Sequence, residues 1–204
     1  MRILLISALF FLSACSTFES AQSQAKKRLA CDYSVENTYF SQLDEEHIFR
    51  ANLSFFQKEI SGLLVIKKTA ENAHRVVLTS DFGNTLFDFS IFQSAPYQVN
   101  YVMPDLNKKM ILNFLAKDFQ ILLNQHFTMT EKSTNDSLTI YQGKFGKKYM
   151  NILVNSATNH LQEIIQSNKR KPKVRFVFET AQEERVTIQH ENLPIKMIFN
   201  KIDF

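Results

Sequence analysis

The sequence predicts one domain of the α+β class that is mainly antiparallel β-sheet with one substantial helix. Three observations lead to this prediction. Apolar and polar residues alternate over many short segments, turn-forming residues separate these segments, and one stretch near the middle changes to helical spacing. Short successive strands joined by tight turns form a meander rather than a βαβ unit. Because one sheet face is rich in phenylalanine, we expect the sheet to curl around the helix or around something else.

The composition is that of an ordinary globular protein. The chain has 204 residues, of which 45% are hydrophobic and 22% charged, and this length suits a single domain with a sizeable core. The formal net charge of +4 is too small to indicate a nucleic-acid-binding protein. It is compatible with a partner surface made of anionic lipid. We therefore expect no nucleic-acid partner.

Residues 1–14 are expected to be a signal peptide outside the fold. Met1-Arg2 is a positive start, and the apolar run Ile3–Leu12 is shorter than the roughly 20 residues that cross a bilayer. The following Leu12-Ser13-Ala14-Cys15 resembles a bacterial lipobox, which implies lipidation of Cys15 after cleavage. An ordinary signal peptide that happens to contain a cysteine is the alternative.

A lipidated Cys15 would anchor the chain to a membrane, since each buried methylene contributes about 0.8 kcal/mol. Ser16 follows the cysteine, which by resemblance to the bacterial sorting rule implies the periplasmic face of the outer membrane. Residues 15–30 are expected to be a lipidated tether, and residues 31–204 the folded domain. Cys31 then has no partner within the chain, so it is a spare thiol or pairs with another chain.

The first half of the domain is predicted to be a meander. In residues 47–55, the side chains of Phe49, Ala51, Leu53 and Phe55 fall on one side of a strand. The further strands expected before the helix are Gly62–Lys68, Arg75–Ser80, Thr85–Phe92 and Tyr97–Val102.

Apolar residues then recur at three- and four-residue intervals, which predicts an amphipathic helix with Asp105 or Asn107 as its cap and its end near Asn124. About ten strands are expected in all, by the same alternation. Those after the helix are Ser137–Gln142, Asn151–Val154, Leu161–Gln166, Val174–Glu179, Arg185–His190 and Lys196–Ile202.

Residues 75–89, RVVLTSDFGNTLFDF, resemble the LolB family, the outer-membrane receptors of the bacterial lipoprotein-localisation pathway. In that family a strand of the form R-hydrophobic-hydrophobic-L-T leads into a proline-apolar-glycine turn and a second alternating strand. The resemblance implies an unclosed half β-barrel covered by a helical lid, as in LolB and the periplasmic LolA carriers. It also implies that Phe82 and Gly83 form the tip of a membrane-insertion loop, although Asp81 stands where the family has proline.

The function implied is binding of acyl chains in a hydrophobic half-barrel and transfer of lipoproteins, or lipid, to the membrane. Removing apolar surface from water is favourable by about 25 cal/mol per Å², so a carrier needs a dry concave face. A LolA-like periplasmic carrier is the implied partner, and the chain is expected to be a monomer. The candidate cavity-lining residues are Phe49, Leu53, Phe55, Phe87, Phe89, Ile91, Phe176 and Phe178. The candidate lid residues are Met110, Ile111, Phe114 and Leu115. Any of these residues has ordinary core packing as its alternative role.

Two other functions stay open. One is a structural or accessory lipoprotein of envelope assembly, with the same fold and a filled core. The other is a lipid hydrolase, which requires a serine, a histidine and an acidic residue to converge in space. The 5 histidines have no zinc-binding spacing and there is no G-x-S-x-G motif, so no metal site, cofactor or catalytic residue is predicted. The basic run 169–173 is either a solvated loop or a contact for lipid headgroups.

Overall fold

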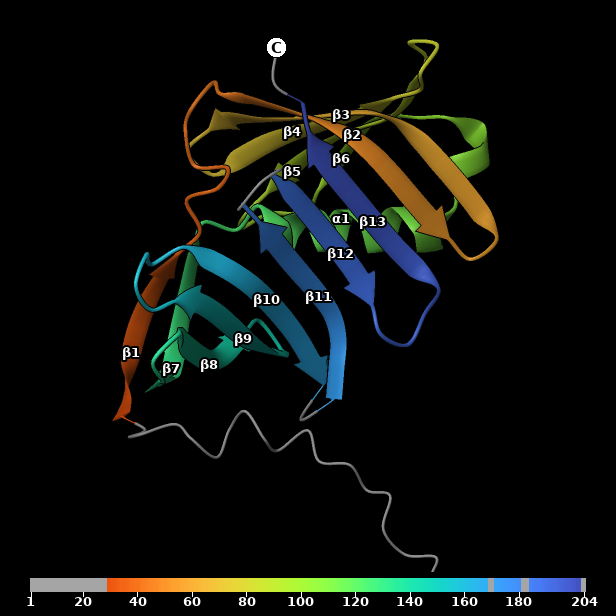
Figure 1. The fold of residues 1–204 in the computed structure, drawn as a ribbon. Helices are drawn as coiled ribbons and strands as arrows, with labels where there is room; N and C mark the ends of the chain where they lie inside the picture. The colour runs from red at the N-terminus through yellow and green to blue at the C-terminus, as the bar shows by residue number, and fades with distance from the viewer. Residues whose placement is uncertain (1–28, 169–170, 181–183, 203–204) are drawn as a thin grey trace, which may run out of the picture.

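A computed structural model describes residues 29–168, 171–180 and 184–202, in which one antiparallel sheet curves around an α-helix (Figure 1). The predicted signal peptide and Cys15 lie outside the described residues. The sheet has 13 strands and its two edge strands do not pair with each other. The predicted mainly antiparallel architecture, with a helix and an unclosed sheet, is therefore confirmed.

The strands before the helix are β1 (Leu29–Glu36), β2 (Glu46–Phe55), β3 (Lys58–Ala70), β4 (Ala73–Thr79), β5 (Thr85–Phe92) and β6 (Gln98–Val102). A 3₁₀ turn, η1 (Pro104–Leu106), precedes the helix α1 (Lys109–Leu122). The strands after the helix are β7 (His126–Thr134), β8 (Leu138–Phe145), β9 (Lys148–Asn155), β10 (Leu161–Asn168), β11 (Lys171–Glu179), β12 (Arg185–His190) and β13 (Ile195–Lys201).

Two meanders make up the sheet. Strands β2 to β6 pair in chain order, as do β7 to β13, and the pairing of β13 with β2 joins the two sets. Strand β1 pairs with β7, so β1 and β6 are the free edges. Because α1 connects the edge strand β6 to β7 near the opposite edge, the helix crosses the concave side of the sheet (Figure 1).

The core lies between α1 and the concave face. Along β2 the burial alternates, and Phe49, Ala51, Leu53 and Phe55 are all buried, as their spacing predicts. From the helix, the fully buried ring of Phe119 has its centroid 6.2 Å from that of Phe87 on β5 and 6.2 Å from that of Phe199 on β13. The helix thus packs against both meanders at once.

The helix differs from its prediction at the N-terminal end. Pro104 begins the 3₁₀ turn, and Asn107 has φ −74° and ψ 58°, which is not a helical cap conformation. The N-cap of α1 is Lys108, whose side chain makes no capping hydrogen bond. At the other end, the Asn37 side chain donates a 2.8 Å hydrogen bond to the carbonyl of Leu122, which would otherwise lack an intrahelical partner.

Strands β1 and β7 have no counterpart in the sequence prediction. Strand β1 begins at Leu29, inside the segment expected to be tether. In β7 only Phe127 and Met129 are large buried residues. The residues that follow them are polar, so the apolar–polar alternation that predicts a strand is too short to be recognised. These two strands pair with each other and extend the sheet beyond β8.

Candidate functional site

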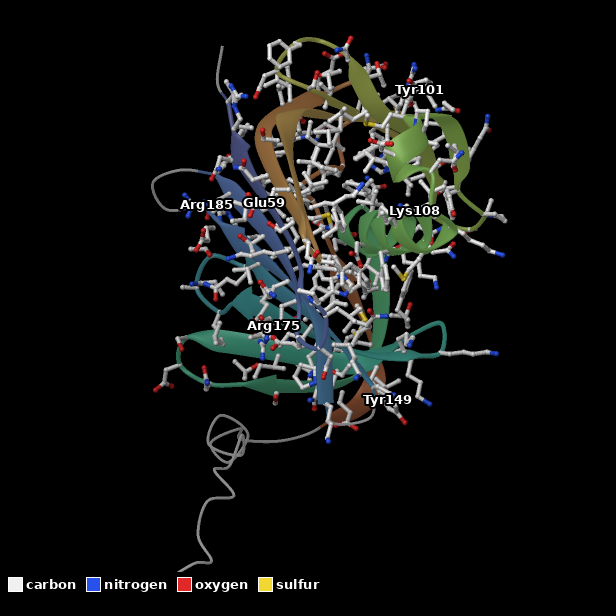
Figure 2. The ribbon with its side chains drawn as sticks, turned by 90° about the vertical axis from the view of Figure 1, so that its right-hand side faces the viewer. Glu59, Tyr101, Lys108, Tyr149, Arg175 and Arg185 are labelled. Carbon is white, nitrogen blue, oxygen red and sulfur yellow. The ribbon has the colours of Figure 1, made fainter. Side chains whose placement is uncertain are left out.

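A cavity of about 620 Å³ opens between the C-terminal half of α1, the β8–β9 hairpin turn and the adjoining ends of β10, β11 and β12. In Figure 2, α1 lies on the right with Lys108 at its N-terminal end, and Tyr149 of the hairpin lies below it. This volume is within the range of about 300–1,000 Å³ that is usual for ligand pockets. The apolar lining residues are Phe114, Ile121, Phe145, Val174 and Leu193.

Helical spacing divides α1 between the core and the cavity. Phe114, Lys117, Asp118 and Ile121 recur at three- and four-residue intervals and line the cavity. Leu115, Phe119 and Leu122, on the neighbouring face, are buried in the core. One helix therefore fills the concave face of the sheet and also forms a wall of the cavity.

The β8–β9 turn brings two lysines to the cavity. Phe145 pairs with Lys148 in register, which leaves Gly146 and Lys147 as a two-residue turn. Gly146, at the first position of this turn, has φ +59°, a backbone conformation that favours glycine. This turn places Phe145, Lys147 and Lys148 along the same edge of the cavity.

A β-bulge brings a third lysine. Between β10 and β11, Gln166 pairs with Val174 and Ser167 pairs with Pro172, so that Lys173 has no opposite residue. In a regular strand Lys173 and Val174 would point to opposite faces. At the bulge both line the cavity, as expected of an irregularity that redirects a side chain.

A buried pair, Asp118 and His190, forms one wall of the cavity. The imidazole Nε2 lies 2.7 Å from the Oδ2 of Asp118, and the side chains are only 6% and 4% exposed. Burial raises the pKa of the Asp118 carboxyl group, and the hydrogen bond to His190 opposes this shift. The His190 ring also contacts the ring of Phe114 edge to face, at 5.5 Å between centroids.

The lining of the cavity is positively charged. Lys117, Lys147, Lys148 and Lys173 line it, and none of them forms an ion pair with a carboxylate in the part of the chain that the structure describes. Asp118 is the one carboxylate among the described lining residues. An anion is therefore favoured at this opening.

The Asp118–His190 pair has the side-chain types of two members of a catalytic triad, which also requires a nucleophile. None of the described residues that line the cavity is a serine, threonine or cysteine.

The eight residues predicted to line an acyl cavity are all buried in the core instead of bordering this cavity. Seven of them border neither this cavity nor the outer hollow described below, whereas Phe178 also borders that hollow. The buried residues are Phe49, Leu53, Phe55, Phe87, Phe89, Ile91, Phe176 and Phe178. Their contact with acyl chains stays a prediction that requires α1 to move.

The predicted lid residues divide into three groups. Ile111 and Leu115 are buried in the core, Met110 is 54% exposed, and Phe114 lines the cavity. Sequence reasoning placed all of these residues on one helix, and the structure does so as well. Only Phe114 touches the space in which a ligand fits.

The predicted tip loop joins β4 to β5. The Gly83 amide donates a 2.9 Å hydrogen bond to the Ser80 carbonyl, and Gly83 has φ +82°, which favours glycine. At this turn Phe82 is 93% exposed. The Asp81 carboxylate pairs with the Arg50 guanidinium, so its charge beside the protruding ring is balanced.

A second hollow, of about 1060 Å³, lies on the outer side around β10 and β11. Its walls include charged side chains that are paired: Glu163 with Arg175 at 2.7 Å, and Glu179 with Arg185 at 3.7 Å. These charged groups make the hollow a poor site for an acyl chain, because an alkyl chain bound there would remove them from water without replacing its hydrogen bonds.

Models of known protein families were compared with the sequence, and none matches it. The comparison with curated proteins gives no match either. Among the described residues there is no helix of the length and apolar character needed to span a membrane.

Proposed function

We propose that this protein binds an acyl chain in the cavity beside α1 and transfers a lipidated molecule to a membrane, as the resemblance to the LolB family implies. The observation that carries this proposal is the cavity of about 620 Å³ beside the helix of an unclosed sheet, whose lining includes Phe114, Phe145 and Leu193. Burial of an alkyl chain against Phe114, Ile121 and Val174 stabilises the complex by about 25 cal/mol per Å².

Two further features support transfer at a membrane. The exposed Phe82 at the β4–β5 turn is suited to entering a bilayer surface, and its neighbour Asp81 is neutralised by Arg50. A lipid anchor on Cys15 would keep the domain at the outer membrane, where a LolA-like carrier delivers its cargo. Transfer then requires only that the cargo bind more favourably here than to the carrier, and more favourably still in the bilayer.

The test is to identify what the protein carries. The mature chain, extracted gently from membranes, is analysed for bound acyl species by mass spectrometry. We expect about one acyl chain per protein molecule, from the fit of the cavity to one drug-sized ligand. Leu193→Glu, at the cavity, should lose this lipid, whereas the matched variant Leu43→Glu, at a residue that is 60% exposed elsewhere, should retain it.

One observation favours the alternative function, an accessory lipoprotein of envelope assembly. The concave face is packed solidly against α1, with Phe87, Phe119 and Phe199 fully buried. A scaffold needs such a core and no ligand. Absence of acyl species from the purified wild-type protein, with the fold intact, would favour this alternative and reject the proposal.

A further inference from the structure

We infer that the occupant of the cavity is a phosphate-bearing amphiphile, whose acyl chain lies against the apolar floor and whose phosphate is held by Lys117, Lys147, Lys148 and Lys173. The inference rests on the proposed function and names the class of ligand. It is carried by the presence of apolar side chains and four lysines in the lining of one cavity.

The four lysines come from three separate parts of the chain, which the fold brings to one cavity. Lys117 lies on α1, Lys147 in the β8–β9 turn beside Lys148 at the start of β9, and Lys173 at the bulge in β11. Two lysines elsewhere do have carboxylate partners: Lys67 lies 3.2 Å from Glu46 and Lys201 lies 2.7 Å from Glu184. The cavity lysines lack such partners among the described carboxylates.

The accessibility of the lining residues favours one orientation of the ligand. Lys117, Lys147 and Lys148 are exposed, whereas the apolar lining residues Phe114, Phe145 and Leu193 are partly buried. We therefore expect the charged headgroup against the exposed lysines, where it stays hydrated, and the alkyl chain against the partly buried apolar side chains. The side-chain amides of Gln166, Asn168 and Asn192 line the same cavity and can donate hydrogen bonds to phosphate oxygens.

Asp118 already has another partner. Its carboxyl group is buried and hydrogen-bonded to His190, whereas Lys117, Lys147 and Lys148 are exposed to an incoming anion. Several separate lysine ammonium groups can surround the oxygens of one phosphate. A phosphate headgroup therefore suits these four lysines better than a carboxylate headgroup does.

The experiment compares four probes on the full mature chain by isothermal titration: lysophosphatidic acid, lysophosphatidylcholine of the same chain length, the matching long-chain alcohol, and inorganic phosphate. We expect lysophosphatidic acid to bind roughly tenfold tighter than lysophosphatidylcholine, and added salt to reduce this preference. The alcohol and inorganic phosphate should each bind more weakly than lysophosphatidic acid.

Lys117→Gln/Lys173→Gln should weaken binding of lysophosphatidic acid roughly tenfold and leave binding of the alcohol unchanged. Lys58→Gln/Lys196→Gln removes the same charge from exposed residues outside the cavity and should bind as the wild type does. Equal affinity for the two lysolipids, or equal binding by the two double variants, would overturn the inference and leave acyl binding intact. If inorganic phosphate bound as tightly as lysophosphatidic acid, the lysines would be a site for a free anion, and this result would also overturn the inference. Failure of every amphiphile to bind would reject the proposed function itself.

Discussion

The Nε2 atom of His190, at the end of β12, lies 2.7 Å from the Oδ2 atom of Asp118 on α1, a residue 72 positions earlier in the chain. The contact joins the helix to the C-terminal meander at the wall of the cavity. Both side chains are buried, so either one left without the other would be a buried polar group lacking its partner. Such groups destabilise a fold more than an intact pair stabilises it.

His190→Ala should therefore lower the free energy of unfolding by about 3 kcal/mol at neutral pH, since it leaves the Asp118 carboxylate unpaired. Burial already raises the Asp118 pKa in the folded protein, and loss of His190 raises it further. A carboxyl group whose pKa is higher in the folded than in the unfolded protein stabilises the fold below its unfolded pKa of about 3.9, and this stabilisation is lost as the pH rises through its folded pKa. The difference in unfolding free energy between His190→Ala and the wild type should therefore become smaller in acid. Urea denaturation at pH 4 and pH 8 measures this difference.

The double variant Asp118→Asn/His190→Ala is the control for this prediction. It removes the carboxylate, so its stability relative to the wild type should depend less on pH than that of His190→Ala. An equal deficit for His190→Ala at both pH values would show that the imidazole acts through packing against Phe114 alone.

Arg75→Met tests the ion pair between β4 and β5. The Arg75 Nη2 lies 2.6 Å from Asp88 Oδ2 and its Nε lies 3.1 Å from Oδ1, and these hydrogen bonds hold the Asp88 pKa below its ordinary value. A lowered pKa gives stability that is present above the unfolded value of about 3.9 and is lost as pH falls through the folded value. Because Arg75 is 56% exposed, we expect a loss of only about 1 kcal/mol at pH 7.

At pH 2 the Arg75→Met variant should unfold at nearly the same urea concentration as the wild type. Lys58→Met, which removes an exposed cation without a described ion-pair partner, should change stability little at either pH. A larger loss in acid than at neutral pH would contradict the assignment.

The alternation of apolar and polar residues in the sequence was sufficient to place most strands, because every second side chain of a half-buried strand faces the core. The set from Phe49 to Phe55 shows this, since each expected inward residue is buried. Strand β7 was missed because beyond Met129 its residues are polar and only partly buried. The beginning of α1 was misplaced because Asp105 and Asn107 are good caps by type, while Pro104 starts a separate 3₁₀ turn.

The cavity itself was beyond sequence reasoning. In the sequence Lys117 and Asp118 are ordinary polar residues of an amphipathic helix, and nothing local marks His190 as the partner of Asp118. The position of Lys173 depends on a bulge that strand patterns do not reveal. The one available signal was the i, i+3, i+4, i+7 series from Phe114 to Ile121, which forms a second face on a helix whose first face already fills the core.

Two buried histidines predict acid sensitivity. Burial lowers the pKa of both His47 and His74, and the His74 Nε2 lies 2.9 Å from the Phe40 carbonyl oxygen. A lowered histidine pKa gives stability that is present above the unfolded value of about 6.5 and is lost as pH falls through the folded value. We expect each histidine to contribute a slope of up to about 1.4 kcal/mol per pH unit in that range.

His74→Gln should reduce the slope, while its amide can still donate a hydrogen bond to the Phe40 carbonyl. Thermal or urea unfolding at half-unit steps from pH 7.5 to 5 gives the slope directly. If the variant kept the full wild-type slope, His74 would not be one of the groups responsible.

Phe82→Glu should separate folding from membrane delivery. Because Phe82 is 93% exposed, the free energy of unfolding should change by less than about 0.5 kcal/mol. Delivery of a fluorescent lipidated cargo to vesicles of anionic phospholipid should fall strongly, since a carboxylate at the tip resists entry into lipid.

Leu43→Glu, at another exposed apolar residue, should deliver cargo normally. Arg50→Gln should give an intermediate rate, because it leaves the Asp81 carboxylate unbalanced beside an intact Phe82. Normal delivery by Phe82→Glu would show that this loop is not the point of contact with the membrane.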